Sequence, residues 1–200
     1  MVATTLNVNP TLTLTNTPPL NDLRHWWKAR QADPDRALAY ADDAPQDFAG
    51  LLNRLRTGEY LFYLAYHGDT VVGAMWLHDL VRESDGTPHA GWLGTYVVPS
   101  HRGQRTTQAM WKLICKAVTA LGVRSMYIAS HHANTRAHTV AEQHLNFRRV
   151  GVYPEFTRFS GIPTDCLILC MHKEDQAAAW ALARARASQQ LTAHGASEVA

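Results

Sequence analysis

The residues of this 200-residue chain that could do chemistry gather between Val97 and Leu121. An apolar, β-rich run ends at Pro99, the pair Arg102 and Gly103 follows, and a helical pattern begins at once. A helix N-terminus carries four backbone N–H groups without intrahelical partners and the positive end of the helix dipole. Such a junction can bind an anion, most often a phosphate, through the backbone alone. The stretch is therefore a candidate phosphate site.

The helix after this turn is supported by apolar residues that recur at spacings of three and four over 110–121. Thr106 or Thr107 could cap its start, and its first turn holds no acidic residue that would repel an anion. Arg102 and Arg105 flank the turn and could pair with phosphate oxygens. An ordinary strand-loop-helix connection with two solvated arginines is the alternative.

Composition limits the possible partners. Hydrophobic residues make up 46% of the chain, charged residues 18%, and the formal net charge is +2. Lysines and arginines are scattered rather than gathered in a stripe, which argues against a nucleic-acid partner. The sequence contains neither a signal-peptide pattern nor the ~20 consecutive apolar residues of a membrane span. We therefore predict a cytoplasmic protein that binds neither nucleic acid nor a membrane.

The chain divides into a flexible leader over 1–10, one domain over 11–172, and a C-terminal helix and tail over 173–200. Strands are expected over 11–15, 60–66, 71–81, 90–98, 125–130, 148–160 and 165–172, and helices over 21–32, 43–56, 106–121 and 134–146. The strand-helix-strand order places 125–130 parallel to 90–98. The alanine-rich tail could dock on the domain or support a homodimer.

Two motifs stand within this order of elements. Residues 97–104 read VVPSHRGQ, and a looser pattern joins Asn134 and Ala137 to Phe147 and Gly151. With the order of the elements, they resemble the GNAT acyltransferase superfamily, in which V-x-P-x-x-R-G-x opens the acyl-CoA pyrophosphate loop. The resemblance implies an α/β (α+β) fold. Its single mixed, mostly antiparallel sheet would have six to seven strands, helices on both faces, and splayed central parallel strands.

The resemblance also implies an activity, the transfer of an acyl group from acetyl-CoA or another acyl-CoA to an amine of a small molecule or peptide. The amine would attack directly in a ternary complex, and the N–H of Val97 or Val98 would polarise the thioester carbonyl. The residues implied in cofactor binding are Val97, Val98, Arg102, Gly103, Gln104, Arg105, Thr106, Thr107 and Asn134.

The sequence departs from the family pattern at two places. Arg105 and Thr107 stand where the family commonly has glycine, and Ala141 or Glu142 stands where it has a tyrosine that reprotonates the leaving thiolate. A catalytically inactive GNAT-like module that senses acyl-CoA or binds a partner is therefore the alternative function.

Acyl transfer to an amine needs a proton acceptor and a proton donor close to the thioester. The catalytic candidates are Tyr96, Val97, Ser130, His131 and Glu142. Aromatic residues that could shape an acceptor cleft are Trp26, Trp27, Tyr153 and Phe156. The eleven histidines show no recognised metal-ligand spacing, so no metal is expected, and a histidine-based metal protein is the remotest alternative.

Overall fold

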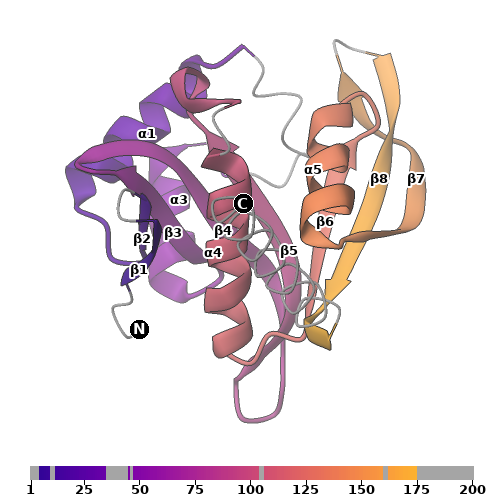
Figure 1. The fold of residues 1–200 in the computed structure, drawn as a ribbon, viewed down its shortest axis with the longest axis horizontal. Coiled ribbons are helices and arrows are strands. Elements are labelled where there is room, and N and C mark those ends of the chain that lie inside the picture. The colour runs from indigo at the N-terminus through magenta and orange to yellow at the C-terminus, as the bar shows by residue number, and fades with distance from the viewer. Residues whose placement is uncertain are drawn as a thin grey trace, which may run out of the picture.

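The computed structural model describes residues 5–9, 12–34, 45, 47–103, 106–159 and 162–174 (Figure 1). Its strands are β1 (Thr5–Asn9), β2 (Leu12–Thr15), β3 (Leu61–His67), β4 (Thr70–Arg82), β5 (Pro88–Val97), β6 (Ser125–His131), β7 (Arg148–Phe159) and β8 (Ile162–His172). Its helices are α1 (Leu20–Ala32), α3 (Phe48–Thr57), α4 (Thr106–Ala120) and α5 (Thr135–Leu145), with a 3₁₀ turn, η1, at Pro99–His101. These strands form one sheet in the order β1-β2-β3-β4-β5-β6-β8-β7.

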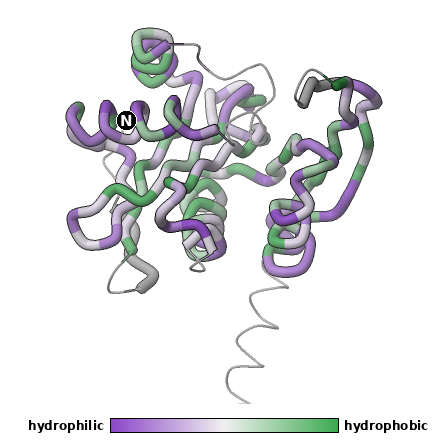
Figure 2. Tube along the Cα trace, turned by 90° about the horizontal axis from the view of Figure 1, so that it is seen from above, coloured by the Kyte–Doolittle hydropathy of each residue, from purple (hydrophilic) through white to green (hydrophobic). Residues whose placement is uncertain are grey.

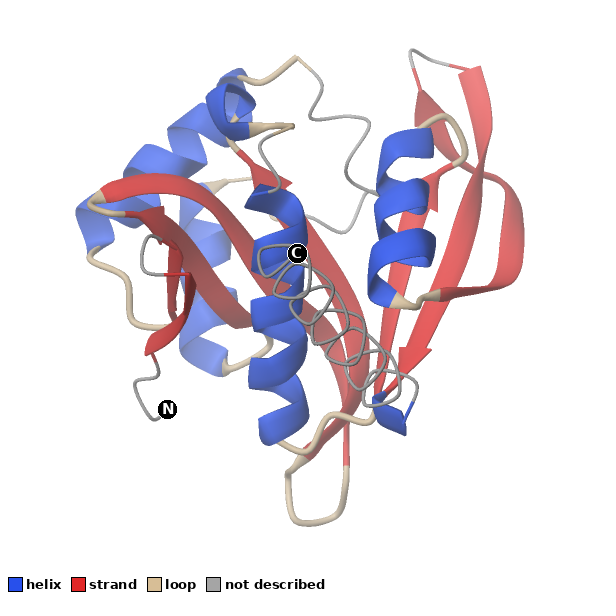
Figure 3. Cartoon of the chain, in the orientation of Figure 1, coloured by secondary structure: helices blue, strands red, loops and turns tan. Residues whose placement is uncertain are grey.

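The described sheet is mixed, with β5 and β6 as its parallel pair and antiparallel pairing elsewhere. Only residues 90–92 of β5 are in register with 125–127 of β6. Beyond these pairs the two strands diverge, as their ribbons show in Figure 3. The predicted fold class and the splayed parallel strands are thus confirmed. We call the region between the unpaired ends of β5 and β6 the splay.

One strand lies where the sequence predicted a flexible leader. Residues 5–9 form β1, which pairs antiparallel with β2. The edge of a sheet presents a row of unpaired backbone N–H and C=O groups, and a short segment can pair with them. This strand brings the described sheet to eight strands.

The other differences lie at helix ends. The expected helix over 43–56 begins later, at Phe48, because the Asp47 side chain accepts a 2.6 Å hydrogen bond from the Gly50 amide and caps it there. The C-terminal helix expected after residue 174 falls outside the described residues. No helix in the described part of the chain is long and apolar enough to cross a membrane.

Helices cover both faces of the sheet, and the core is correspondingly divided in two. One cluster lies between the sheet and α4 and α5, and it includes Met110, Ile114 and Leu145. The other lies under α1 and α3 and is rich in aromatic rings, including Trp26 and Trp76. Figure 2 shows hydrophobic and hydrophilic stretches alternating along both the helices and the strands. The apolar faces of α1 and α4 thus fix the strands that end at the splay.

Candidate functional site

The edge of β5 that faces the splay is identified by its hydrogen bonds to β4. The Val98 N–H donates to the Val72 carbonyl at 3.0 Å, so it points away from the splay. Because the N–H groups of an antiparallel strand point alternately to its two sides, the Val97 N–H points toward β6. Of the two N–H groups expected at this position, the geometry therefore favours Val97.

The turn that follows β5 leads directly into α4. Pro99 opens η1, Gly103 adopts a φ of +83° that favours glycine, and α4 begins at Thr106. Thr106 and Thr107 are partly buried in the first turn of α4, which carries no acidic residue. The helix N-terminus therefore lies beside the end of β5, as an anion site requires. Gln104 and Arg105 lie outside the described residues.

Arg102 has protein partners that the sequence did not indicate. Its Nη2 forms an ion pair with Asp33 at the C-cap of α1, and its Nε donates to the Val97 carbonyl at 3.1 Å. The Asp33 side chain is 1% exposed. The guanidinium also lies 5.6 Å from the centroid of the Tyr96 ring. Arg102 thus ties the end of β5 to α1 and has a positioning role, while its contact with phosphate stays a prediction.

Tyr96 and the two tryptophans of α1 are buried beneath that helix. The Tyr96 hydroxyl donates to the Ala29 carbonyl at 3.2 Å, and burial, followed by the hydrogen bond to Asp33, raises its pKa above the usual range. Trp26 and Trp27 are 1% and 8% exposed and pack in the core. Their expected role in an acceptor cleft is corrected accordingly. Leucine and tryptophan at helical spacing give α1 an apolar face that packs on the sheet.

The end of β6 forms the opposite side of the splay. Ser130 and His131 are buried there, and the His131 carbonyl accepts a 2.9 Å hydrogen bond from the Asn134 amide. The Asn134 side chain accepts from the Ala137 amide and so caps α5. Burial lowers the pKa of His138, which also hydrogen-bonds the His131 backbone. These contacts fix the end of β6 and the start of α5 beside the splay.

Arg136 is a cation at this site that sequence reasoning missed. A Cβ atom placed on Gly103 would lie 3.0 Å from the Arg136 Nη2 atom. The guanidinium therefore reaches from the first turn of α5 to the turn before α4. Its position two residues after Asn134 was the available signal, although nothing in a single sequence indicates which way an exposed side chain on a helix extends.

The remaining predicted residues lie on α5 and β7. Glu142 forms a 3.3 Å ion pair with Arg149, and both side chains are partly exposed. Tyr153 is 49% exposed on β7, at the edge of the sheet. Phe156 belongs to β7, and its side chain is outside the described set. Among the described residues, no group of three or more histidines, cysteines or carboxylates could hold a metal ion.

The comparison with known proteins agrees with this arrangement. The family described as the acetyltransferase (GNAT) family matches residues 20–147. The chain belongs to the GNAT acetyltransferase family. No curated protein matches it. Within the GNAT fold, β5, the turn at Gly103 and α4 form the segment that the sequence motif indicated.

Solved GNAT structures share the fold of this chain at low sequence identity. RimJ of Mycobacterium smegmatis, in complex with CoA-disulfide, is 20% identical over 92% of this chain and 93% of its own, with a TM-score of 0.71. Spermidine N-acetyltransferase from Vibrio cholerae, in complex with CoA and spermine, is 15% identical over 84% and 99%, with a TM-score of 0.71. The microcin C7 self-immunity acetyltransferase MccE, in complex with acetyl-CoA and AMP, is 12% identical over 82% and 93%, with a TM-score of 0.63.

Proposed function

We propose that this GNAT protein transfers the acetyl group of acetyl-CoA to a primary amine of a small molecule or peptide. The observation that carries the proposal is the splay, into which the Val97 N–H points and beside which α4 begins. The solved relatives support it, since they were determined with CoA, acetyl-CoA or a CoA disulfide. Acetyl-CoA as co-substrate also agrees with the cytoplasmic location expected from the sequence.

The residues at the splay fit a thioester with an anionic tail. The backbone N–H groups at the start of α4, the glycine conformation at Gly103 and the guanidinium of Arg136 favour a pyrophosphate at that end. The Val97 N–H would donate to the thioester oxygen, where negative charge develops during the reaction. Acetyl-CoA would supply the carbonyl carbon that the amine attacks, with formation of a C–N bond and cleavage of the C–S bond.

Binding and turnover can be tested separately. Isothermal titration with acetyl-CoA should give a Kd of roughly 1–100 μM, within the range common for enzyme substrates. In the presence of an accepted amine, thiol release should then follow the amine concentration. Absence of binding at several hundred micromolar acetyl-CoA would contradict the proposal.

Arg136 offers a test of the phosphate end of the site. Replacing Arg136 with alanine removes a cation beside Gly103, and we expect the Kd for acetyl-CoA to rise about tenfold, as for loss of one charge-assisted hydrogen bond. Arg124→Ala is the matched control, because this exposed arginine immediately precedes β6, at the end of the strand opposite the splay. Equal affinities for Arg136→Ala and the unmodified protein would place the phosphates elsewhere.

A further inference from the structure

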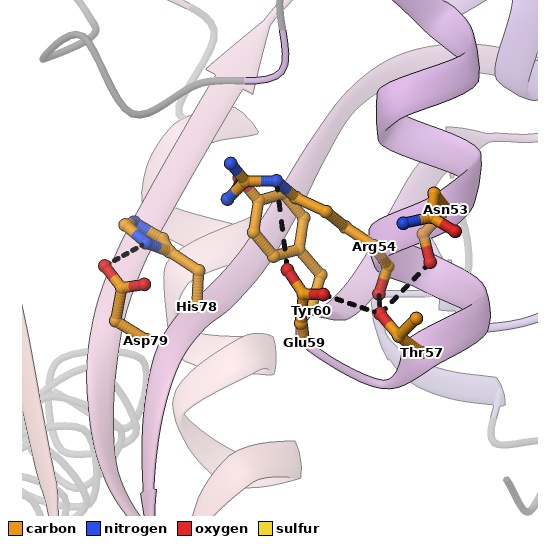
Figure 4. A network of polar contacts seen from close by, with 7 residues as sticks. All are labelled: Asn53, Arg54, Thr57, Glu59, Tyr60, His78 and Asp79. Atoms are coloured by element: carbon orange, nitrogen blue, oxygen red, sulfur yellow. Dashed lines mark hydrogen bonds and ion pairs between the residues drawn. The ribbon is translucent and has the colours of Figure 1, made fainter.

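A polar pocket lies on the face of the sheet opposite α4, at the end of β4 and β5 that is away from the splay. Its volume is about 220 Å³, and it forms where the end of α3 and the start of β3 meet the second half of β4. The polar residues that line it are Arg54, Thr57, Glu59, Tyr60, Asp79 and Arg82. Figure 4 shows the side-chain network around it.

The pocket is separate from the proposed site of acetyl transfer. Gly73 of β4 lies opposite Val97, whereas Arg82 lies opposite Pro88 at the far end of the same strand pair. Asp79 follows Gly73 by six residues, which at strand spacing is roughly 20 Å. A small molecule in this pocket is therefore a second ligand, distinct from both the amine acceptor and the cofactor.

A bulge in β4 shapes one wall of the pocket. The register between β4 and β5 shifts between His78 and Val81, and Asp79 has a φ of +47°, which residues other than glycine rarely adopt. Adjacent side chains in a regular strand point to opposite faces. Here the Asp79 carboxylate bonds the Nδ1 atom of its neighbour His78 at 3.0 Å. The bulge thus holds a carboxylate beside His78 at the pocket wall.

Two of the four charges that line the pocket largely satisfy each other. The Arg54 guanidinium donates to the Tyr60 hydroxyl at 3.2 Å, and its Nε atom lies 4.0 Å from the Glu59 carboxylate. That carboxylate also accepts a 3.0 Å hydrogen bond from the Thr57 hydroxyl. The guanidinium lies 5.3 Å from the centroid of the Tyr60 ring, across which it extends in Figure 4. This cation and this anion are therefore occupied by protein partners.

Arg82 and Asp79 are the charges that remain for a ligand. Arg82 donates to the Gly86 and Gly58 carbonyls at 2.9 and 3.1 Å, and in the described part of the chain it pairs with no carboxylate. A guanidinium has five N–H donors, so further donors are left. The Asp79 side chain is 59% exposed, and it bonds the His78 imidazole. The pocket thus presents one cation and one anion on the same strand.

We propose that this pocket binds a free α-amino acid in its zwitterionic form. The carboxylate of the amino acid accepts charge-assisted hydrogen bonds from Arg82, and its ammonium group donates to Asp79. The last residues of α3 border the same pocket, so the negative end of the helix dipole also attracts the ammonium group. A polyamine or a dicarboxylate fits less well, because it would place a like charge beside Arg82 or Asp79. Binding here does not depend on the proposed acetyl transfer.

Isothermal titration with each of the twenty protein amino acids tests this assignment. We expect at least one of them to bind saturably, with a Kd of about 1 mM or lower. The amino acid that binds most tightly is then compared with its decarboxylated amine and its deaminated acid. For phenylalanine these analogues are 2-phenylethylamine and 3-phenylpropionate. Each analogue lacks one of the two charges and should bind about tenfold more weakly, as for loss of one charge-assisted hydrogen bond.

Two substitutions connect each charge of the ligand with its partner. Arg82→Gln should raise the Kd of the amino acid to that of the decarboxylated amine. Asp79→Asn should raise it to that of the deaminated acid, and asparagine tolerates the positive φ at this position. Arg56→Gln and Asp69→Asn are the matched controls, because both residues are exposed and lie outside the pocket. They should leave all three Kd values unchanged.

The folding of each variant is checked by thermal unfolding, because Arg82 also links Gly58 to Gly86. If Arg82→Gln does not fold, Asp79→Asn decides alone, through loss of the preference for the amino acid over its deaminated acid. The assignment is overturned if no amino acid binds, if neither substitution weakens binding, or if the amino acid and both analogues bind equally. Thiol release from acetyl-CoA is measured separately and bears only on the proposed function.

Discussion

The free energy of unfolding of the Arg102→Ala variant should be about 3 kcal/mol lower than that of the unmodified protein. The substitution removes the ion pair that Arg102 forms with the buried Asp33 carboxylate, and loss of one member of a buried pair typically costs this much. It also removes the hydrogen bond from Nε to the Val97 carbonyl. For a chain of this size, the loss corresponds to a Tm lower by roughly 6–12 °C. Urea denaturation at neutral pH, followed by tryptophan fluorescence, measures the change.

Two further variants sharpen the result. Arg56→Ala, which removes an exposed arginine of α3, should change the unfolding free energy by less than about 0.5 kcal/mol. Pairing Arg102→Met with Asp33→Leu removes both charges and should recover part of the lost stability. If the Arg102→Ala variant kept its full stability and only bound acetyl-CoA more weakly, the positioning role would be wrong. That result would support the phosphate contact predicted from the sequence.

Gly73→Ala should destabilise the fold by about 2 kcal/mol, although alanine is usually the better residue in folded backbone. A Cβ atom at Gly73 would lie 2.4 Å from the Tyr96 carbonyl oxygen and 2.9 Å from the Met110 Cε atom. Backbone cannot move aside as a flexible side chain can, so β4 must separate from β5 opposite Val97. We expect weaker acetyl-CoA binding as well, measured by titration at a temperature where the variant is folded.

Gly151→Ala is the matched control for this variant. No atom lies within 4 Å of a Cβ at Gly151, and its φ is outside the range that disfavours alanine. Its stability should therefore stay within about 0.5 kcal/mol of the unmodified protein. Equal stability of Gly73→Ala and Gly151→Ala would show that the strands accommodate the methyl group without separating.

The sequence predicted the part of the site that is local in the chain. The end of β5, the turn at Gly103 and the start of α4 are consecutive, and their pattern of apolar, glycine and polar residues specifies both backbone and direction. The parallel placement of β6 followed from the strand-helix-strand order. The general fold and the splay can therefore be predicted from the sequence alone.

Contacts between residues that are far apart in the sequence cannot be predicted in this way. Asp33 and Arg102 are 69 positions apart, and no local pattern indicates that they pair. From the sequence alone, Arg102 is therefore predicted to contact phosphate and not Asp33. Trp26 shows the same limitation, because its burial depends on where α1 packs on the sheet. The bulge at Asp79 interrupts the regular pairing of the 13-residue strand β4, and residues 77–82 contain no glycine or proline that would indicate it.

Only three residue pairs join β5 to β6, so the sheet consists of two parts that are connected along a short stretch of backbone pairing. On one side lie the strands from β1 to β5, and on the other lie β6, β8 and β7. A ligand bound in the splay would contact both parts of the sheet. Part of its binding free energy would therefore stabilise the folded state, because it would hold the two parts together. At a ligand concentration a hundred times Kd, such binding adds about 2.7 kcal/mol to the free energy of unfolding. The stability of the folded protein would then depend on the concentration of acetyl-CoA.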